Sequence, residues 1–454
     1  MRYAVRSFWG SAHVVRSALH VRTHRGRTIS GRVLVEKISV LRYNTEKPAE
    51  GGIPVNKLFC RAFQGVMKVG NYFVGYRTPE LLEGPGCVGQ LPALLAERGA
   101  RQVLLVTGRH ITKSGLNAGL IEGLKAAGIA VTVFTDLSPD PSSDDVERGY
   151  ALCRAEGCDT IIAFGGGSPM DCAKAIAARL ARPDRTVAQL QGLLKVRRPI
   201  LPFYAVPTTA GTGSETTIAA VITDSATHHK AAINDPALIP LCAVLDPELT
   251  VGLPPFTTGT TGMDALCHAV EAYTNHIYNT RLEDDMALQA VKLIYENLLP
   301  AYRDGSDLAA RQNMQRAAFY AGRAFTRGGV GYVHAVGHAI GSLYGVSHGL
   351  AMAVILPHVM RQFGPAARRR LAELAEHCGI PGADEGARAE AFLRWMEETD
   401  RAMDLPAGLD MIRDEDVEQI IAWAMAEANP LYPVPAVWGR EDFRQLIRTL
   451  RTAR

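Results

Sequence analysis

Residues 159–177 read DTIIAFGGGSPMDCAKAIA, in which an apolar, β-branched run reaches three consecutive glycines and continues into a helix-forming run. Glycines at the end of a strand let the backbone turn sharply and approach a ligand without side-chain obstruction. We expect Ser168 to cap the helix, with Pro169 at its first position and Asp171 completing a Ser-x-x-Asp capping box. Free N–H groups at such a helix start suit a phosphate; the alternative is a tight turn that binds nothing.

The sequence before this turn alternates between strand and helix patterns. Short apolar runs at 101–108, 130–136 and 159–167 predict strands, and the stretches 116–127 and 144–156 predict helices between them. Such alternation implies right-handed βαβ units and a parallel sheet. The glycine turn is neither the G-x-G-x-x-G fingerprint nor a Walker loop, so neither of those motif rules applies to it.

A second loop, PTTAGTGSE at 207–215, follows the apolar run PFYAV and is rich in hydroxyls and glycine. Thr208, Thr209 and Thr212 are candidates to hydrogen-bond a ribose or a pyrophosphate. Alone, the segment is equally compatible with an ordinary Ser/Thr turn. Two such loops after strands make nucleotide binding the stronger interpretation.

Beyond Leu253-Pro254-Pro255 the pattern changes to long stretches with a period near 3.6, which predict helices throughout. We therefore expect an α/β N-terminal dinucleotide-binding domain with a parallel sheet, followed by an all-α C-terminal metal-binding domain. The predicted limits are a basic, weakly ordered extension at 1–56, the α/β domain at 57–252 and the helical metal and substrate domain at 253–454.

The helical half contains a metal-type pattern in GMDALCHAVEAY (262–273) and GYVHAVGHAIGSLYGVSHG (331–349). Positions four apart on a helix project from one face, so Asp264 with His268, and His334 with His338, each aim two donors at one point. His348 follows ten residues later. One carboxylate with several imidazoles suits Fe²⁺ or Zn²⁺ rather than Ca²⁺ or Mg²⁺.

The pattern holds one histidine more than a four-donor site with an open substrate position requires. One of His334, His338 and His348 is therefore expected to lie outside the ligand sphere or to act in catalysis. Spacing alone does not identify which one.

Composition excludes several other classes of protein. The formal charge of +3 gives no general case for nucleic-acid binding, and no apolar run of about 20 residues predicts a membrane span. Eight scattered cysteines without a CxxC pair indicate free thiols in a reducing cytoplasm. Residues 1–35 hold seven Arg and no acidic residue, which is also typical of a mitochondrial transit peptide. Deleting residues 1–50 should leave activity intact.

Over roughly residues 75–450 the chain resembles the iron-containing (group III) alcohol dehydrogenases. The segments that carry the resemblance are GGGSPMDCAK, PTTAGTGSE, GMDALCHAVEAY and VHAVGHAIG with the later HG. The resemblance implies a dinucleotide cleft between the two domains, with metal ligands at Asp264, His268, His334 and His348. It places His338 beside the nicotinamide and the substrate. The implied cofactor contacts are Gly166, Gly167, Ser168, Asp171, Thr208, Thr209, Thr212 and Lys230.

The chain departs from the family pattern at three places. Val336-Gly337-His338-Ala339 stands where the family often has Met-Ala-His-Pro, and Cys267 replaces a common Thr. NAD-preferring members carry Asp at the end of the first strand, where this chain has Gly108 and Arg109. Without that carboxylate a 2′-phosphate is not repelled, and Arg109 can pair with it, so we expect NAD or NADP to bind, with tolerance of NADP(H).

The predicted activity is metal-dependent hydride transfer between a small alcohol and the nicotinamide, with the metal polarising the substrate oxygen and His338 handling the proton. We expect a homo-oligomer, a dimer, in the cytoplasm, without nucleic-acid or membrane partners. The rival interpretations are a dehydroquinate-synthase-like lyase, a maleylacetate-reductase-like enzyme and a non-catalytic nucleotide-binding sensor. The lyase requires a Lys/Arg cluster for a phosphorylated substrate, whereas the metal region here is apolar and rich in glycine.

Overall fold

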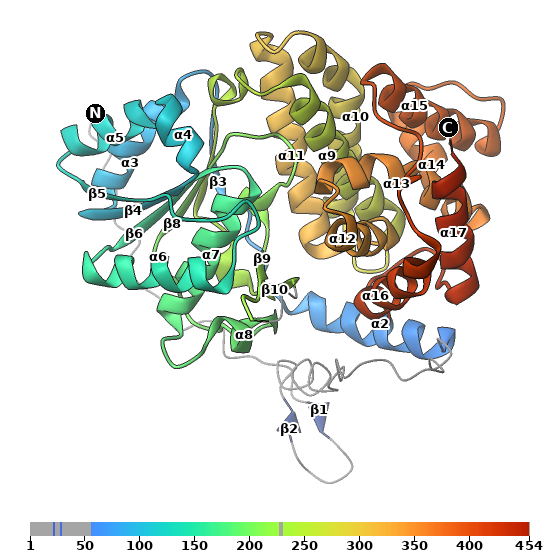
Figure 1. Cartoon of the computed structure of the whole chain (residues 1–454), viewed down its shortest axis with the longest axis horizontal. Helices are drawn as coiled ribbons and strands as arrows, with labels where there is room; N and C mark the ends of the chain where they lie inside the picture. The colour runs from blue at the N-terminus through green and yellow to red at the C-terminus, as the bar shows by residue number, and fades with distance from the viewer. Residues whose placement is uncertain (1–20, 23–27, 30–55, 227–229, 454) are drawn as a thin grey trace, which may run out of the picture.

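The computed structural model describes residues 21–22, 28–29, 56–226 and 230–453 (Figure 1). Its first half is built on a six-stranded, all-parallel sheet with the strand order β3-β11-β8-β6-β4-β5. These strands are β3 (Glu80–Glu83), β4 (Gln102–Thr107), β5 (Ala130–Phe134), β6 (Thr160–Gly165), β8 (Phe203–Pro207) and β11 (Cys242–Leu245).

Helices cover both faces of this sheet because alternate side chains of its central strands are apolar on either side. On one face Leu105 and Ile162 pack with α3 (Leu91–Glu97) and α5 (Ala118–Ala126). On the other face Leu104 and Ile161 pack with α6 (Ser143–Ala155) and α7 (Gly167–Ala181). The short α4 (Arg109–Ser114) follows β4, and α8 (Val187–Leu190) follows α7. The predicted α/β half with its parallel sheet is confirmed.

A small mixed sheet, which the sequence patterns did not predict, lies beside the main one. Its order is β7-β10-β9, with β7 (Gly192–Leu193) parallel and β9 (Ala219–Thr223) antiparallel to β10 (Lys230–Asn234). It brings Lys230 and the segment after the second loop to the same side of the molecule as α7.

The second half is all-helical, as predicted. Its helices are α9 (Pro255–Asn275), α10 (Arg281–Arg303), α11 (Leu308–Gly328), α12 (Tyr332–Tyr344), α13 (His348–Phe363), α14 (Pro365–His377), α15 (Glu385–Ala402), α16 (Val417–Ala428) and α17 (Arg440–Thr452). Together they enclose one large apolar core in which α9 is buried along almost its whole length. The exact domain limits stay a prediction.

Close backbone contacts join the two halves at the second loop. A Cβ added to Gly211 would lie 2.7 Å from the Thr261 carbonyl oxygen on α9. Gly213 has φ 60°, and its added Cβ would lie 2.6 Å from Gly322 Cα on α11. Only glycine allows this approach, which sets the loop directly against the helices of the metal half.

Before the sheet lies α2 (Lys57–Tyr72), drawn in blue in Figure 1 beneath β10 and α16. Asn56 caps it by accepting from the Phe59 N–H at 3.0 Å, and its inward residues include Cys60, Gln64 and Met67. Earlier still, β1 (Val21–Arg22) pairs antiparallel with β2 (Thr28–Ile29). The prediction of a weakly ordered extension falls mostly on residues outside the described ones. Within the described residues, no helix is long and apolar enough to cross a membrane.

Candidate active site

The glycine-rich turn forms as predicted, but its helix starts earlier than expected. Strand β6 ends at Gly165, Gly166 is the N-cap and α7 begins at Gly167. The predicted capping box at Ser168 is therefore wrong: the Ser168 hydroxyl donates to the Pro139 carbonyl instead. Asp171 also turns away from the helix start, accepting from the Ser214 hydroxyl at 2.9 Å and the Val221 N–H at 3.0 Å.

The two predicted phosphate loops lie against each other at the carboxyl ends of β6 and β8. The Thr208 N–H donates to the Gly165 carbonyl at 3.1 Å. A Cβ added to Gly166 would lie 3.3 Å from the Thr209 side chain. A Cβ added to Gly167 would lie 3.0 Å from the Thr212 side chain. The side chains of Thr209 and Thr212 thus lie against the start of α7, and the Thr212 hydroxyl oxygen also accepts from the Ser214 N–H at 3.3 Å. This is the arrangement that binds a pyrophosphate at a sheet edge.

Lys174, which the sequence patterns did not single out, ties the second loop to α7. Its side chain is fully buried, and its Nζ donates to Ser214 and Thr217, through both carbonyl and hydroxyl at 2.6–3.0 Å, and to the Ala219 carbonyl at 3.0 Å. Burial lowers the pKa of Lys174 to about 8, against the attraction of Asp171 and Glu215. At neutral pH the ammonium is retained. A buried cation with this many acceptors fixes the backbone around it.

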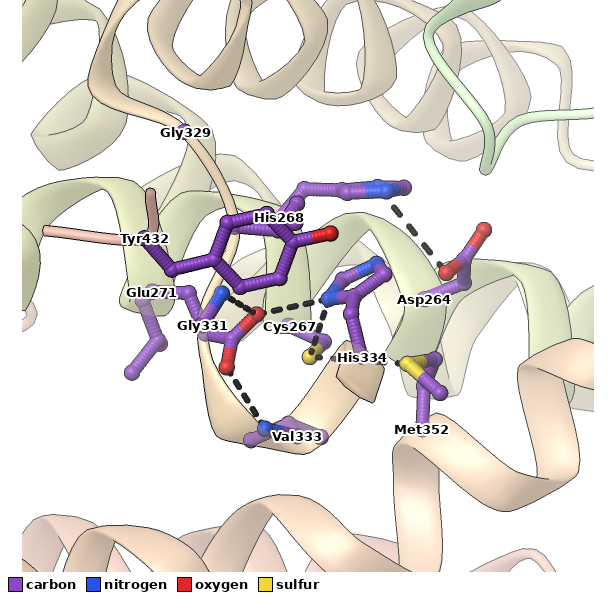
Figure 2. Close-up of polar contacts among 12 residues, drawn as sticks. Asp264, Cys267, His268, Glu271, Gly329, Gly331, Val333, His334, Met352 and Tyr432 are labelled. Carbon is purple, nitrogen blue, oxygen red and sulfur yellow. Dashed lines mark hydrogen bonds and ion pairs between the residues drawn. The ribbon is translucent and has the colours of Figure 1, made fainter. Parts of the chain in front are cut away.

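The metal-type residues converge in the helical half, as the spacing predicted. Asp264, His268, His334 and His348, called the donor cluster below, each offer one ligand atom within 4.8 Å of the others. Asp264 and His268 come from α9, His334 from α12, and His348 from the first position of α13. Figure 2 shows Asp264, His268 and His334 pointing toward a common region.

The cluster fits a metal ion because its inward atoms are otherwise unpaired. Among the described residues, Asp264 Oδ1, His268 Nδ1 and His334 Nε2 are buried without a hydrogen-bond partner. A buried polar atom without a partner costs about 1–3 kcal/mol, and three around one point call for a shared partner. His348 Nε2 lies 3.3 Å from Asp264 Oδ1 and completes the set.

Protonation of the cluster also suits a metal. Burial lowers the pKa of His268 to about 3 and that of His334 well below its ordinary value, so both imidazoles are neutral. Burial alone would raise the pKa of Asp264, but His268 and His348 outweigh it and hold that pKa below the ordinary value. His268 is stacked on Phe325 with ring centroids 4.1 Å apart. The cluster therefore presents one carboxylate and neutral imidazoles, the forms that bind metal.

Glu271 orients the cluster from behind, a role missed at the sequence level. It accepts His334 Nδ1 at 2.6 Å and the N–H groups of Gly331 and Val333 at 2.8 Å, so it also caps the start of α12 (Figure 2). Burial raises the pKa of Glu271 to about 7, against the two N–H bonds that favour the carboxylate. In its ionised form the carboxylate only accepts, so His334 Nδ1 then carries the proton and Nε2 is left for a metal. The available signal was its place three residues after His268, on the same helical face.

Cys267 lies behind the cluster rather than inside it. Its Sγ is 3.7 Å from His334 Nδ1 and 4.0 Å from Met352 Sδ. Burial raises its pKa well above the ordinary value, so the thiol stays neutral. A neutral thiol fills space behind His334 and is a poor metal ligand.

His338 lies at the open side of the cluster, with 39% of its side chain exposed. Its ring stacks on that of His348 with centroids 5.2 Å apart. Its Nδ1 lies 2.8 Å from Glu427 Oε1, which also accepts the Tyr432 hydroxyl at 2.8 Å. Burial would lower the pKa of His338, but Glu427 outweighs it and raises that pKa above the ordinary value. Glu427 and Tyr432 carry no local sequence signal, since they lie 89 and 94 residues beyond His338.

The remaining residues predicted to contact the cofactor are Gly108 and Lys230, which come from different parts of the α/β half. Gly108 is the N-cap of α4 at the end of β4. The next residue, Arg109, forms an ion pair with Asp136, and Arg148 reaches the same carboxylate at 2.8 Å. Lys230 pairs with Asp140 at 2.8 Å and lies near enough to His338 for its charge to oppose protonation there.

Comparison with known proteins covers both halves of the chain. The family model described as iron-containing alcohol dehydrogenase matches residues 78–247, and the C-terminal model of the Fe-containing alcohol dehydrogenase family matches 258–450. The NAD-dependent methanol dehydrogenase of Bacillus methanolicus is 37% identical over 382 residues, which is 83% of this chain and 99% of that protein.

Solved structures give the same result for the fold. The 1,3-propanediol oxidoreductase structure has a TM-score of 0.80 at 34% identity, and the match covers 83% of this chain and 100% of that one. The sulfoacetaldehyde reductase of Bifidobacterium kashiwanohense, solved with NAD⁺, has a TM-score of 0.74 at 29% identity and covers 84% and 99%.

Proposed function

Because the chain belongs to the iron-containing alcohol dehydrogenase family and is an NAD-linked alcohol dehydrogenase of that family, we propose which of its residues perform the reaction. The donor cluster holds the metal, Fe²⁺ by family and Zn²⁺ as the alternative. The observation that carries this assignment is the group of three unpaired buried atoms facing one point. When bound, the metal supplies Lewis-acid polarisation of the substrate oxygen.

The two loops and α7 bind the cofactor. Backbone N–H groups at Gly166 and Gly167 and the hydroxyls of Thr208, Thr209 and Thr212 take the pyrophosphate and ribose, at the carboxyl ends of parallel strands. Ser168 borders the same turn. Asp171 acts indirectly, because both its oxygens hold the second loop. Lys230 and His338, which lie close enough for the Lys230 charge to act on His338, would border the nicotinamide end of a bound cofactor.

The reaction is a reversible hydride transfer from the alcohol carbon to nicotinamide C4, during which the hydroxyl proton leaves the substrate. We infer that His338 carries this proton, because its side chain is 39% exposed beside the donor cluster and its ring is held by Glu427. His268 is buried and stacked on Phe325, which closes that side of the cluster with an apolar ring. The relatives act on methanol, 1,3-propanediol and sulfoacetaldehyde by name, so we propose a small primary or secondary alcohol and its aldehyde or ketone as substrate pair.

Metal analysis of the purified protein, coupled to an NADH and NADPH oxidation screen over short aldehydes, tests the assignment. We expect about one Fe per chain and turnover that a chelator removes. His338→Ala should keep the metal and lower kcat about 100-fold. Full activity in protein shown to be free of metal would refute the assignment of the donor cluster, and full activity of the His338→Ala variant would refute the proton role.

We further propose that NADP(H) is accepted beside NAD(H). Gly108 carries no carboxylate that would repel a 2′-phosphate, and Arg109, whose partner is the half-exposed Asp136, is the cation that would bind it. Arg148 contributes no surplus charge, because it pairs with both Asp136 and Asp145. The matched variant is Gly108→Asp: its Cβ would meet only the flexible His110 ring, at 3.1 Å. It should lower kcat/KM for NADPH about tenfold while sparing NADH. A strong NADH preference of the unchanged enzyme would contradict the proposal.

A homodimer stays our prediction for the assembly, and sedimentation velocity at micromolar concentration measures it directly.

A further inference from the structure

Helix α2 lies before residue 78, where the family match begins, yet it contacts the active-site side of the helical half. Arg61 donates to the Val434 carbonyl at 2.8 Å and to the Pro435 carbonyl at 2.7 Å. Gln64 donates to the Pro430 carbonyl at 3.3 Å and to the Tyr432 carbonyl at 2.7 Å. Two side chains of α2 therefore hold four carbonyls of one irregular segment, residues 429–435.

This segment carries the side chain that fixes the partner of His338. Tyr432 donates its hydroxyl to Glu427 Oε1, the same oxygen that faces His338 Nδ1 at 2.8 Å. A continuous path thus runs from Gln64 through the Tyr432 backbone to Glu427 and the His338 ring. Within the helical half, Tyr278 adds one support by donating to the Leu431 carbonyl at 2.9 Å.

The contacts of α2 with residues 429–435 are buried and fully hydrogen-bonded at Gln64. Gln64 is 1% exposed, and its amide oxygen accepts from Arg61 at 2.8 Å, so its oxygen and its nitrogen are both bonded. A buried amide without hydrogen bonds is unfavourable, so loss of any one of these hydrogen bonds costs free energy. Cys60 joins the core of the helical half, while Met67 and Gly70 line a small cavity with Leu193 and Pro236 of the α/β half. The helix is therefore hydrogen-bonded to the helical half and lies beside the α/β half.

We propose that α2 is a positioning element for the proton-handling site: by holding residues 429–435 it sets the orientation of Tyr432, Glu427 and hence His338. This rests on the proton role proposed for His338. Arg61 and Gln64 touch no reacting atom and act through the segment they hold. A side chain displaced by about 1 Å can cost up to about 100-fold in rate, so a partial release of the segment is expected to cost about tenfold.

The test uses the full chain with Gln64→Leu and Arg61→Leu, which keep the apolar volume of the side chains and remove the donors. Each variant should lower kcat about tenfold, leave KM for NAD within about twofold, and leave the metal content unchanged. Val69→Ala, at an exposed position of the same helix, is the matched control and should have wild-type kcat. Circular dichroism and the thermal midpoint exclude a variant that has lost its fold.

A double-mutant cycle separates positioning from general stability. Gln64→Leu should have no further effect on kcat in a His338→Ala background, because the group it positions is already gone. An equal loss in both backgrounds, or an unchanged kcat in both Leu variants, overturns the proposal. The underlying proton role has its own readout: if the His338→Ala variant alone is fully active, it is that role which fails.

Discussion

A fully buried ionisable side chain fixes a functional segment in each half of the molecule, Lys174 in the α/β half and Glu271 in the helical half, and the two are used differently. In the α/β half, Lys174 donates its hydrogen bonds to backbone carbonyls and hydroxyls of residues 214–219. In the helical half, Glu271 binds two N–H groups of α12 and also His334, a proposed metal ligand. Lys174 therefore acts on the fold and only indirectly on the cofactor, whereas Glu271 contacts a proposed metal ligand directly.

The largest effect is expected from His334→Ala, which removes the ligand that Glu271 orients. Metal binding and kcat should both be lost, the latter by at least about 1,000-fold, since Lewis-acid polarisation is worth several kcal/mol. Metal content by mass spectrometry and kcat are measured together. His358→Ala on α13 is the control and should keep both. Loss of activity with full metal content would separate His334 from the ligand set.

Lys174→Met should be the next largest change and should act on stability. It takes the ammonium away from the oxygens of Ser214, Thr217 and Ala219 and removes the positive charge beside Asp171 and Glu215, at a cost of about 3–5 kcal/mol in the free energy of unfolding. Urea denaturation measures this, with the exposed Lys125→Met as control, expected within about 0.5 kcal/mol of wild type. A decrease in the free energy of unfolding of less than about 1 kcal/mol would show that Lys174 does not hold the second loop in place.

The difference in the free energy of unfolding between the wild type and Lys174→Met should depend on pH. The pKa of Lys174 is lowered by burial to about 8 in the folded chain, from 10.5 as its ordinary value. Between these values the unfolded chain holds a proton that the folded chain has released, so the folded wild type gains stability as pH rises. Relative to Lys174→Met, the free energy of unfolding should therefore increase from pH 8 toward 10.5. If the free energy of unfolding changed with pH in the same way in both proteins, the lowered pKa of Lys174 would be wrong.

Glu271→Gln should have a smaller effect, and it should lower metal affinity rather than the stability of the fold. The amide has one accepting oxygen for three N–H donors, so the orientation of His334 is weakened. Loss of such a partner typically costs about 10–100-fold in metal affinity. Competition with a chelator measures this, and Glu376→Gln on the surface of α14 serves as control. If Glu271→Gln destabilised the fold as much as Lys174→Met while binding metal normally, the contrast between the two charges would be wrong.

The smallest effect is expected from removing residues 1–50, which includes neither buried charge and leaves α2 intact. Turnover and cofactor KM should stay within about twofold of the full chain, because none of the contacts described for α2 is removed. Both are measured in parallel preparations. A loss of turnover would assign a role to the basic segment itself.

The fold and the centre of the site were predictable because they depend on local periodicity. The spacing of Asp264 and His268 on one helix, and of His334 and His338 on another, brings donors together whatever the neighbouring helices do. Glu427 and Tyr432 depend on how α16 packs beside α12, which no local pattern encodes. Ser168 was misassigned as a cap because its residue type suits a helix start, whereas the backbone had already entered the helix at Gly167.

The contact of Gly213 with Gly322 has a practical consequence for enzyme engineering. Even an alanine at Gly213 would place its Cβ 2.6 Å from the opposing backbone, in addition to adopting φ 60°. Randomisation at this seam would therefore yield mostly misfolded clones. A library intended to change substrate size should therefore leave Gly213 and Gly322 unchanged.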